Sequence, residues 1–419
     1  IITMIERKFL PELINHLKCR EISLITGPRQ CGKTTLMGML REHLSKAGEK
    51  SIYLNLDVEW DRAHLESQHA LVRKIELELG KNRGYVFIDE IQQKENAGIF
   101  LKGLFDLNLP HKFIVTGSGS LELKEKIHES LAGRKRLFEL TTLSFEEFCN
   151  YRTEYRYRDR LRDFFETEPG RTSALAQEYM SYGGYPRVVL ESGRLEKRSI
   201  INDIYRSVVE KDVAYLLKVD KPDAFTSLVR LLAARPGSFV NYSELSSAVG
   251  LSMQTVKKYL WYAQKIFIAD CITPFSRNAR KEITLSPVCY FHDLGLRNYA
   301  LGLFGREQSP AEGGFLFQNF VYLLLKSRLQ SSGAVLHYWR TKDKAEVDFV
   351  IESGRDVLPV EVKYSSLTRR EIPRSLRSFI DKYRPAKALL VNLDARSSTI
   401  IGTTEVHCIP YYDLLFEEL

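Results

Sequence analysis

The chain has 419 residues, of which 44% are hydrophobic and 27% charged, and its formal net charge is +8 at pH 7. This composition predicts about two to four folded domains and excludes a disordered chain. No apolar run reaches the roughly 18 residues that a membrane-spanning helix needs, and the N-terminus lacks a secretion signal, so we expect a cytoplasmic protein without a membrane partner. The basic excess favours nucleic acid over a neutral partner.

The first motif in chain order is a glycine-containing loop between an apolar strand candidate, 22–26, and a helical pattern. It fits G-x-x-x-x-G-K-[ST], in which backbone N–H groups and a helix N-terminus surround a phosphate. The lysine would reach the β- and γ-phosphates, and the hydroxyl after it would bind Mg²⁺. We therefore predict an ATP site made of Gly27, Pro28, Arg29, Gln30, Cys31, Gly32, Lys33, Thr34 and Thr35.

A second motif lies about 55 residues after the loop lysine, at the end of an apolar strand candidate, 85–89. This strand ends in Asp89 and Glu90, as in the Walker B element of ATPases. In that element the Asp holds Mg²⁺ and the Glu polarises the attacking water. We therefore predict that the protein hydrolyses ATP, with Lys33 and Glu90 as catalytic residues.

Three further strand candidates, 51–56, 112–116 and 135–141, complete the alternation of strands and helices over residues 4–150. Such alternation predicts a doubly wound parallel sheet. The strand at 112–116 leads to Ser118, which has two interpretations. It is either the polar residue that contacts the γ-phosphate or the attacking water, called sensor 1, or part of an ordinary polar turn.

The cysteines show no C-x-x-C motif or paired spacing, and the nine histidines show no metal-binding pattern. We therefore expect reduced thiols and neither a disulfide framework nor a zinc site. The six cysteines are Cys19, Cys31, Cys149, Cys271, Cys289 and Cys408.

Residues 151–162 interleave five arginines with three tyrosines. They either bind phosphates and stack against aromatic groups, or form an amphipathic helix with solvated arginines.

The pattern of residues 236–275 predicts a winged helix-turn-helix, with Ser252 as the N-cap of its second helix. This unit either contacts DNA or serves as a packing module. The candidate DNA-binding residues of its second helix are Gln254, Thr255, Lys257 and Lys258.

The C-terminal residues 276–419 predict a helix, three strands, a helix and a strand, which is the element order of the PD-(D/E)xK nuclease core. Asp348 and Glu361 stand where that core keeps its metal-binding acids, and Lys363 where it keeps its lysine. Gln318 occupies a position that often carries a Glu, which weakens a metal site. The alternatives are an active nuclease, a degenerate nuclease fold that binds DNA with Lys363 among its contacts, and acids on an exposed strand face.

With the sequence Leu-Ala-Gly-Arg that ends at Arg134, these motifs resemble those of AAA+ ATPases. More narrowly, the chain resembles a prokaryotic AAA+ family, STAND-like and of the MNS type, that ends in a restriction-endonuclease-like domain of long-unknown function. The family's later landmarks also match, and they lie at 183–187, 290–296, 346–350 and 360–363.

This resemblance implies a P-loop core at 4–150, a helical lid at 151–235, the winged helix at 236–275 and the nuclease-like domain at 276–419. It implies ATP and Mg²⁺ as cofactors and a homo-oligomer, with a hexameric ring expected. In such a ring Arg134 would stabilise the γ-phosphate of a neighbouring subunit. Pro186 would lie near the adenine, and Arg187 would sense phosphate or replace Arg134 in cis.

Three functions agree with these expectations. The protein is a DNA motor or remodeller of helicase or branch-migration type, for which branched or junction DNA is the first substrate to test. Alternatively, it is an ATP-gated nuclease effector of a mobile-element or defence system. The third alternative is a STAND-type nucleotide switch. The basic charge and the helix-turn-helix favour the first two, and Gln318 favours the first over the second.

Overall fold

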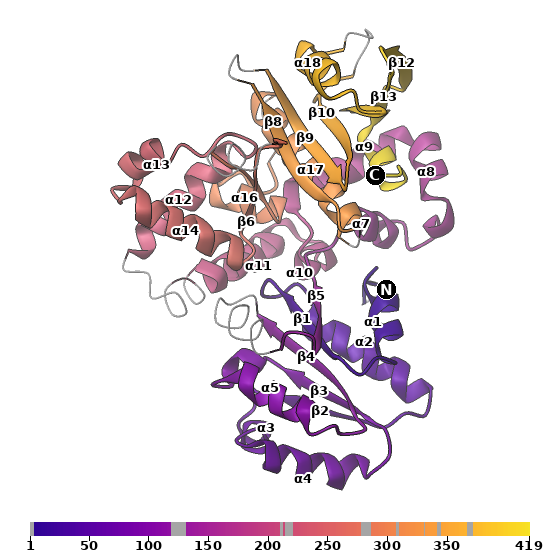
Figure 1. The fold of residues 1–419 in the computed structure, drawn as a ribbon, viewed down its shortest axis with the longest axis vertical. Coiled ribbons are helices and arrows are strands. Elements are labelled where there is room, and N and C mark those ends of the chain that lie inside the picture. Colours follow the sequence, from indigo (N-terminus) through magenta and orange to yellow (C-terminus); the bar gives the residue numbers. More distant parts are fainter. Residues whose placement is uncertain are drawn as a thin grey trace.

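The computed structural model describes residues 4–118, 131–209, 213, 221–277, 286–306, 310–330, 332–341, 345–366 and 372–419. Figure 1 shows an N-terminal sheet with its helices at the bottom of the view and a larger assembly of helices with a second sheet above it. We call them the N-terminal body (residues 9–140) and the second body (residues 143–419). No described helix is long and apolar enough to cross a membrane.

The N-terminal body is built on a parallel sheet of five strands. They are Ile22–Gly27 (β1), Ser51–Asn55 (β2), Tyr85–Asp89 (β3), Lys112–Ser118 (β4) and Lys135–Glu139 (β5). Their order in the sheet is β2-β3-β4-β1-β5. β1 and β3 are buried over their whole length, as in parallel sheets that are covered on both faces. The predicted strands and the doubly wound α/β fold are confirmed.

Helices cover both faces of this sheet. Alternate side chains of a strand point to opposite faces, so Phe87 joins one apolar cluster while Val86 and Ile88 join the other. The first cluster includes α1 (Leu10–His16) and α2 (Lys33–Lys46). The second includes α4 (Gln68–Leu79) and α5 (Ala97–Asp106), and two short elements complete this face, α3 (Glu59–His64) and η1 (Ile91–Gln93).

The helices after the first sheet divide between two apolar cores of the second body. They are α7 (Phe145–Arg152), η2 (Arg158–Arg160), α8 (Leu161–Thr167), α9 (Pro169–Tyr182), α10 (Pro186–Leu190) and α11 (Arg194–Arg206). Helices α7 to α9 share a core with the second sheet and its long helix, and the ring of Phe145 meets that of Phe320 edge to face at 5.0 Å. Helix α11 belongs to a separate core around the next three helices. The region expected to form one lid therefore contributes to two cores.

Three helices and an antiparallel hairpin follow. They are α12 (Pro222–Ala234), α13 (Tyr242–Val249), α14 (Met253–Lys265), β6 (Ala269–Ile272) and β7 (Val288–Phe291). The side chains of Asn241 and Ser252 cap α13 and α14, and Gly250 makes the turn between them with φ +64°. Both helices and the Ser252 cap agree with the sequence prediction. The two hairpin strands pair across the domain boundary expected between residues 275 and 276.

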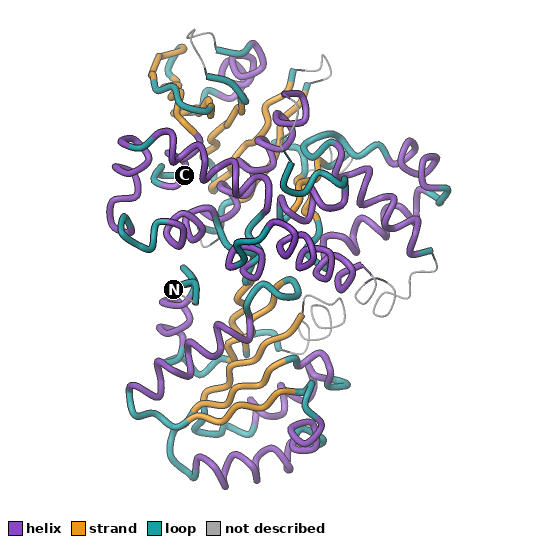
Figure 2. The backbone as a smooth tube through the Cα atoms, turned by 180° about the vertical axis from the view of Figure 1, so that it is seen from behind, coloured by secondary structure: helices purple, strands orange, loops and turns teal. Residues whose placement is uncertain are grey.

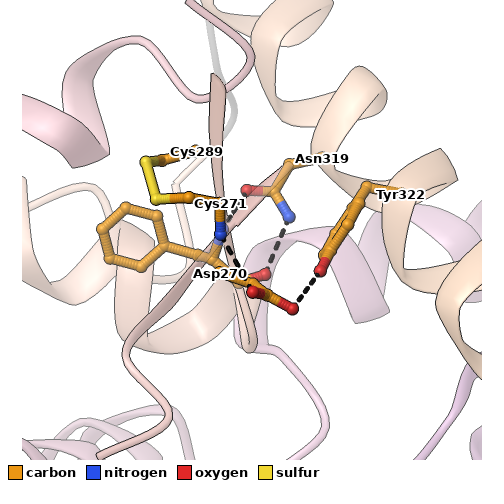
Figure 3. Close-up of a disulfide and its surroundings, with 6 residues drawn as sticks. Asp270, Cys271, Cys289, Asn319 and Tyr322 are labelled. Carbon is orange, nitrogen blue, oxygen red and sulfur yellow. Dashed lines mark hydrogen bonds between the residues drawn. A yellow bond between two sulfur atoms is a disulfide. The ribbon is translucent and has the colours of Figure 1, made fainter. Parts of the chain in front are cut away.

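The expectation that all six cysteines are reduced is wrong for one pair. Cys271 and Cys289 form a disulfide, which Figure 3 shows beside Asp270 and Asn319. The two cysteines are direct partners in the register of β6 and β7, and their Cα atoms are 4.2 Å apart. Strand pairing alone brings them together, so their spacing in the sequence carries no signal. Cys19, Cys31, Cys149 and Cys408 are free.

The C-terminal part of the second body holds a mixed six-stranded sheet. Its elements are α16 (Leu294–Ala300), α17 (Pro310–Leu329), β8 (Val335–Arg340), β9 (Glu346–Ser353), β10 (Asp356–Val362), α18 (Arg374–Tyr383), β11 (Lys387–Asn392), β12 (Ser397–Ile401), β13 (Thr404–Pro410) and η4 (Tyr411–Leu415). The strand order is β12-β13-β11-β10-β9-β8, and both sheets are seen from behind in Figure 2. The predicted order of helix, three strands, helix and strand is confirmed, whereas the β12–β13 hairpin was not predicted.

Candidate functional site

The glycine-containing loop joins β1 to α2 as predicted. Gly27 has no room for a side chain, because a Cβ there would lie 2.0 Å from the Leu140 carbonyl oxygen. Gly32 adopts φ +99°, a conformation that favours glycine. The buried Lys33 amine donates hydrogen bonds to the carbonyl oxygens of Gly27 and Pro28, at 3.2 and 2.8 Å. The loop and its lysine therefore have the geometry of a phosphate-binding loop.

Asp89 at the end of β3 is the centre of the second motif. Its side chain is fully buried and accepts hydrogen bonds from the hydroxyls of Thr34 at 2.8 Å, Tyr53 at 2.7 Å and Thr116. Burial and the neighbouring Asp89 carboxylate raise the pKa of the Tyr53 phenol well above its usual value. The two predicted magnesium ligands, Thr34 and Asp89, thus lie in direct contact.

Glu90, the carboxylate predicted to activate the attacking water, directly follows Asp89 and adopts a left-handed backbone with φ +57°. Its backbone N–H donates to Asp89 Oδ1 at 3.1 Å, and its carboxylate accepts a hydrogen bond from the Gln92 amide. The carbonyl oxygen of that amide accepts from the Ser118 N–H at 3.1 Å. Gln92, which the sequence did not single out, therefore connects the Walker B glutamate to the end of β4.

The end of β4 is where the sequence predicted a sensor residue at Ser118. The side chain that contacts the Walker B acid is that of Thr116, two residues earlier. The Ser118 hydroxyl is buried and has no hydrogen-bond partner among the described residues. Thr116 and Ser118 both lie in β4, the strand between β3 and β1. The role of Ser118 as sensor 1 stays a prediction.

A cavity of about 380 Å³ opens beside the loop, and its lining has two chemical characters. One part is apolar and comes from distant segments, namely Met4, Ile5, Leu143, Pro186 and Leu190. The other part contributes the cations Arg7, Lys33 and Arg187 and the polar Gln30, Thr34, Thr35 and Glu90. An apolar part next to a cationic part suits a base and its phosphates. Pro186 and Arg187, predicted to lie there, do so.

Arg187 reaches the loop directly, since its guanidinium donates to Gln30 Oε1 at 2.9 Å. Gln30 has φ +59°, one of the few left-handed residues other than glycine in the described chain. This contact places the start of α10 over the phosphate-binding loop. The expected role of Arg187 toward the phosphates stays a prediction.

Arg7 is a buried cation of the cavity that the sequence analysis missed. Its guanidinium donates to the Cys31 carbonyl at 2.8 Å, to the Thr141 carbonyl at 2.8 Å and to Glu147 at 3.0 Å. These partners lie in the loop, after β5 and in α7. No local pattern around Arg7 could reveal contacts with residues up to 140 positions away.

Arg134 lies away from this cavity. It directly precedes β5 and pairs with Asp106 at 2.8 Å, and its carbonyl accepts a hydrogen bond from Ile22 at the first residue of β1. The phosphate-binding loop begins at Gly27, the last residue of β1, and so lies at the opposite end of this strand from Arg134. Arg134 therefore does not contact the site of its own chain, and its catalytic role would require a second subunit.

A second cluster of predicted residues lies on the C-terminal sheet. Asp348 accepts hydrogen bonds on both oxygens, from the Gln318 amide at 2.9 Å and from the Val362 N–H at 2.7 Å. Glu361 Oε1 accepts from the Lys363 amine at 2.8 Å. The structure thus brings Gln318, Asp348, Glu361 and Lys363 together, as the predicted element order implied.

Glu361 is buried, and Asp348 is partly buried. Burial, and then the neighbouring Glu361, raise the pKa of Asp348 well above its usual value. Burial also raises the pKa of Glu361, whose Oε2 has no hydrogen-bond partner among the described residues. Lys363 pairs with Glu361, and this pairing raises the pKa of the lysine above its usual value in spite of burial. Because Asp348 already accepts two hydrogen bonds, the cluster offers few free oxygens to a divalent cation.

The predicted DNA-binding residues lie on one helix. Gln254, Lys257 and Lys258 are exposed on α14, while Thr255 is half-buried with its hydroxyl bonded to Ser252 at 2.9 Å. The amines of Lys257 and Lys258 lie over the rings of Tyr242 and Tyr262, at 5.1 and 5.6 Å from the ring centres. The structure therefore leaves a small basic surface on this helix.

The arginine and tyrosine stretch at 151–162 is not one amphipathic helix, because α7 ends at Arg152 and α8 starts at Leu161. Its arginines pair within the chain, for example Arg152 with Glu178 at 2.5 Å and Arg158 with Glu6 at 2.7 Å. This pairing favours a structural role for the stretch over a phosphate-binding surface.

One group of side chains in the described residues has the spacing of a metal site, namely His16, Cys19 and Glu21. The Nδ1 atom of His16 is 2.7 Å from the Ser23 hydroxyl and 3.3 Å from the Lys112 amine. Burial, with the positive charges of Lys112 and Arg136 beside it, lowers the pKa of His16 to about 4. These neighbouring cations oppose a bound metal ion.

Comparison with known proteins agrees with the geometry of the N-terminal body. Residues 19–149 match the family described as AAA domain. This part of the chain is therefore similar to AAA domains. Residues 173–307 and 313–413 match two families described as domains of unknown function, DUF8612 and DUF4143. The first of these matches ends after the β6–β7 hairpin, so both paired strands of the hairpin belong to it.

Two relatives match over most of the chain, beyond the residues that match the AAA domain model. An uncharacterized protein of Haemophilus influenzae is 24% identical over 420 residues, which cover 97% of this chain and 98% of that protein. An uncharacterized protein of Mycobacterium tuberculosis is 26% identical over 380 residues, which cover 88% of this chain and 76% of that protein.

Two solved structures are also similar in part. The Aeropyrum pernix Orc1 protein in complex with DNA is 15% identical, with 71% of this chain and 92% of that chain covered and a TM-score of 0.30. AMPPCP-bound DnaA from Aquifex aeolicus is 15% identical, with 62% and 86% covered and a TM-score of 0.27. With TM-scores this low, we draw nothing further from either likeness.

Proposed function

We propose that this protein is an ATP-hydrolysing AAA+ protein that binds DNA and works as an oligomeric motor or remodeller. The observation that carries the proposal is the contact between Thr34 and the fully buried Asp89 beside a cavity with one apolar and one cationic part. In this arrangement the base of ATP would pack against Pro186, and the phosphates would face Lys33 and Arg187.

The residues present also fit a magnesium ion. Thr34 and Asp89 supply hard oxygen donors 2.8 Å apart next to the phosphate-binding loop, which is the donor type that Mg²⁺ prefers. When bound, the ion would neutralise phosphate charge. Glu90 would accept a proton from the water that attacks the γ-phosphorus, while the bond between the γ-phosphorus and the bridging oxygen breaks and ADP leaves.

Two substitutions test this assignment. Lys33→Ala removes phosphate contacts and should weaken ATP binding, whereas Glu90→Gln keeps the shape of the site and should retain ATP binding but slow hydrolysis by about 10²-fold or more. Binding of a fluorescent ATP analogue and phosphate release would be measured for both variants and the unaltered protein. Hydrolysis by Glu90→Gln at the wild-type rate would show that another residue activates the water.

We further propose that the active form is a ring, with a hexamer expected, in which Arg134 serves the site of a neighbour. The distance of Arg134 from the cavity of its own chain supports this role. Mixing Arg134→Ala subunits with Glu90→Gln subunits should partly restore hydrolysis, because some interfaces regain both groups. A monomeric mass in ATP together with no rescue at any mixing ratio would contradict the ring.

DNA binding is supported by the exposed Lys257 and Lys258 of α14 and by the net charge of +8. Branched and junction DNA are the first substrates to test, in a gel-shift panel with single-stranded, duplex, forked and four-way DNA, with and without ATP. If the two lysines contact phosphates, replacing both by Ala should reduce the slope of log affinity against log salt by about two. An unchanged slope would show that DNA lies elsewhere or does not bind.

Experiments on the C-terminal cluster would distinguish this motor from a nuclease effector. Its assembled acids and lysine favour a nuclease-like fold, but the Gln318 amide on Asp348 fits a metal site poorly. We therefore expect no cleavage of DNA in Mg²⁺ or Mn²⁺. Cleavage that Asp348→Ala abolishes would favour the nuclease, and Gln318→Glu, which restores a carboxylate, is the variant in which cleavage is most expected to appear.

A further inference from the structure

Asp293 is a buried carboxylate of the second body, and its hydrogen-bond partners include Thr142 in the short connection between the two bodies. It follows β7 and is the N-cap of α16, and only 1% of its surface is exposed. One oxygen, Oδ1, accepts a hydrogen bond from the Leu296 N–H at 2.9 Å, which is the ordinary bond of an N-cap. An N-cap alone needs no second partner and can be a serine.

The second oxygen reaches a distant part of the chain. Asp293 Oδ2 accepts a hydrogen bond from the Gly184 N–H at 2.8 Å, across 109 positions of the sequence. The Thr142 side chain also hydrogen-bonds to this carboxylate. The Gly184 carbonyl in turn accepts from the Leu143 N–H at 2.8 Å. One carboxylate therefore joins the start of α16, the turn after α9 and the segment after β5.

The glycines around Asp293 show that this junction requires direct backbone contact. A Cβ on Gly183, which has φ +75°, would lie 2.3 Å from Asp293 Oδ1. A Cβ on Gly184 would lie 2.3 Å from the Leu143 carbonyl oxygen. A Cβ on Gly295 would lie 2.1 Å from the Tyr182 carbonyl oxygen. Any side chain at these three positions would force the segments apart.

Both distant segments held by Asp293 supply walls of the nucleotide cavity. Leu143 lines the cavity directly, and two residues after Gly184 the chain enters α10 with Pro186 and Arg187. Arg187 then bonds to Gln30 of the phosphate-binding loop at 2.9 Å. A shift of the turn at Gly184 would therefore move the groups that cover the base and reach the phosphates.

We propose that Asp293 is a positioning residue of the nucleotide site, which fixes Leu143 and the start of α10 over the phosphate-binding loop. This inference rests on the proposed binding of ATP. Through it, the β6–β7 hairpin and α16 of the second body set the shape of the ATP site in the AAA+ domain. A change in the position of α16, for example when DNA binds the second body, would reach the nucleotide through this carboxylate.

The test separates the cap from the long-range contact. Asp293→Ser keeps a good N-cap for α16 but is too short to reach Gly184, and Asp293→Asn keeps the size but turns one acceptor into a donor. Asn241→Ala is the matched control, since it removes the N-cap of α13, whose bond to the Glu244 N–H is 3.2 Å, without touching the nucleotide cavity.

The readouts are the Kd of a fluorescent ATP analogue, the KM and kcat of hydrolysis, and the thermal midpoint. Both Asp293 variants should raise the Kd and the KM about tenfold, because a charge-assisted hydrogen bond is lost, with a smaller change in kcat. Asn241→Ala should lower the thermal midpoint and leave the Kd within about twofold of wild type.

The outcomes distinguish this proposal from the proposed function. If the unaltered protein does not bind the ATP analogue, ATP binding itself is wrong. If it binds, and either folded Asp293 variant binds within about twofold of it, Asp293 does not position the site. If neither variant folds, the carboxylate serves stability and the positioning role is also overturned. Protection of the Gly184 amide from hydrogen exchange should fall in the folded variants.

Discussion

Replacing Arg7 by Ala should destabilise the protein far more than an ordinary loss of one surface charge. Arg7 is 7% exposed, and its partner Glu147 is 8% exposed. The substitution would leave the Glu147 carboxylate buried with only its hydrogen bonds from Lys8 and Ser144 backbone N–H groups, both at 2.8 Å. Removing one partner of a buried ion pair typically costs about 3–5 kcal/mol.

A double-mutant cycle gives the decisive measurement. Glu147→Gln removes the buried charge but keeps the size of the side chain, so Arg7→Ala combined with Glu147→Gln should cost about 2 kcal/mol less than the sum of the two single changes. Urea unfolding followed by circular dichroism would supply the free energies. The same Arg7 variants should also bind ATP more weakly, because the guanidinium holds the carbonyl of Cys31 in the phosphate-binding loop.

An exposed ion pair of the same chain provides the control. Arg158 pairs with Glu6 at 2.7 Å, and both side chains are more than half exposed. Exposed pairs contribute about 0–1 kcal/mol, so Arg158→Ala should have little effect on the free energy of unfolding. If Arg7→Ala is as mild as Arg158→Ala, or if the double-mutant cycle is additive, the buried pair does not hold the segment before α1 against α7 as the structure indicates.

Three further predictions follow from other parts of the structure. Because the pKa of His16 is lowered to about 4 in the folded protein, the unfolded chain binds more protons at this residue between pH 4 and about 6.5. The free energy of unfolding should therefore fall as the pH drops through this range, and His16→Gln should flatten this dependence in acid titrations. Reducing the disulfide, or replacing Cys271 by Ser, should destabilise the second body by about 3 kcal/mol, because the two cysteines are 18 residues apart in the sequence. Both changes should lower the thermal midpoint, and adding reductant to the Cys271→Ser variant should cause no further decrease. Gln92→Ala should free the Glu90 carboxylate and change kcat for ATP hydrolysis with little change in KM, and an unchanged kcat would assign Gln92 to structure alone.

The sequence predicted the parts of the site that depend on local pattern. The phosphate-binding loop, the strand ending in Asp89 and Glu90, and the alternation of strands and helices have strong signals in residue type and spacing, and the structure contains all three. Pro186 and Arg187, singled out only through a resemblance to a family, line the cavity beside the loop, and their roles toward the base and the phosphates stay predictions. The C-terminal acids and lysine lie together, as expected from the element order predicted for their domain.

The remaining contacts depend on pairings that no local pattern records. The Arg7 contacts, the Asp293 bond to Gly184 and the disulfide all join residues far apart in sequence or across a hairpin. The β12–β13 hairpin was missed because β12 is a short edge strand with mostly exposed side chains, including Ile400, and so lacks the alternation of a half-buried strand. The lid was assigned as one unit because helical periodicity does not show which core a helix joins.

The separation of apolar cores described above has a thermodynamic consequence. Two clusters of buried apolar side chains draw all their members from residues 9–140, while those of the second body begin at Leu143, with Ile5 as their one N-terminal member in the described chain. Polar contacts link the two bodies: the Gln330 amide donates to the Glu139 carbonyl, Arg7 donates to both Cys31 and Glu147, and Asp293 hydrogen-bonds to Thr142 in the connection between them. A rotation of one body against the other would thus expose little apolar surface, so it should carry a small heat-capacity change and respond to ions and protons more than to temperature.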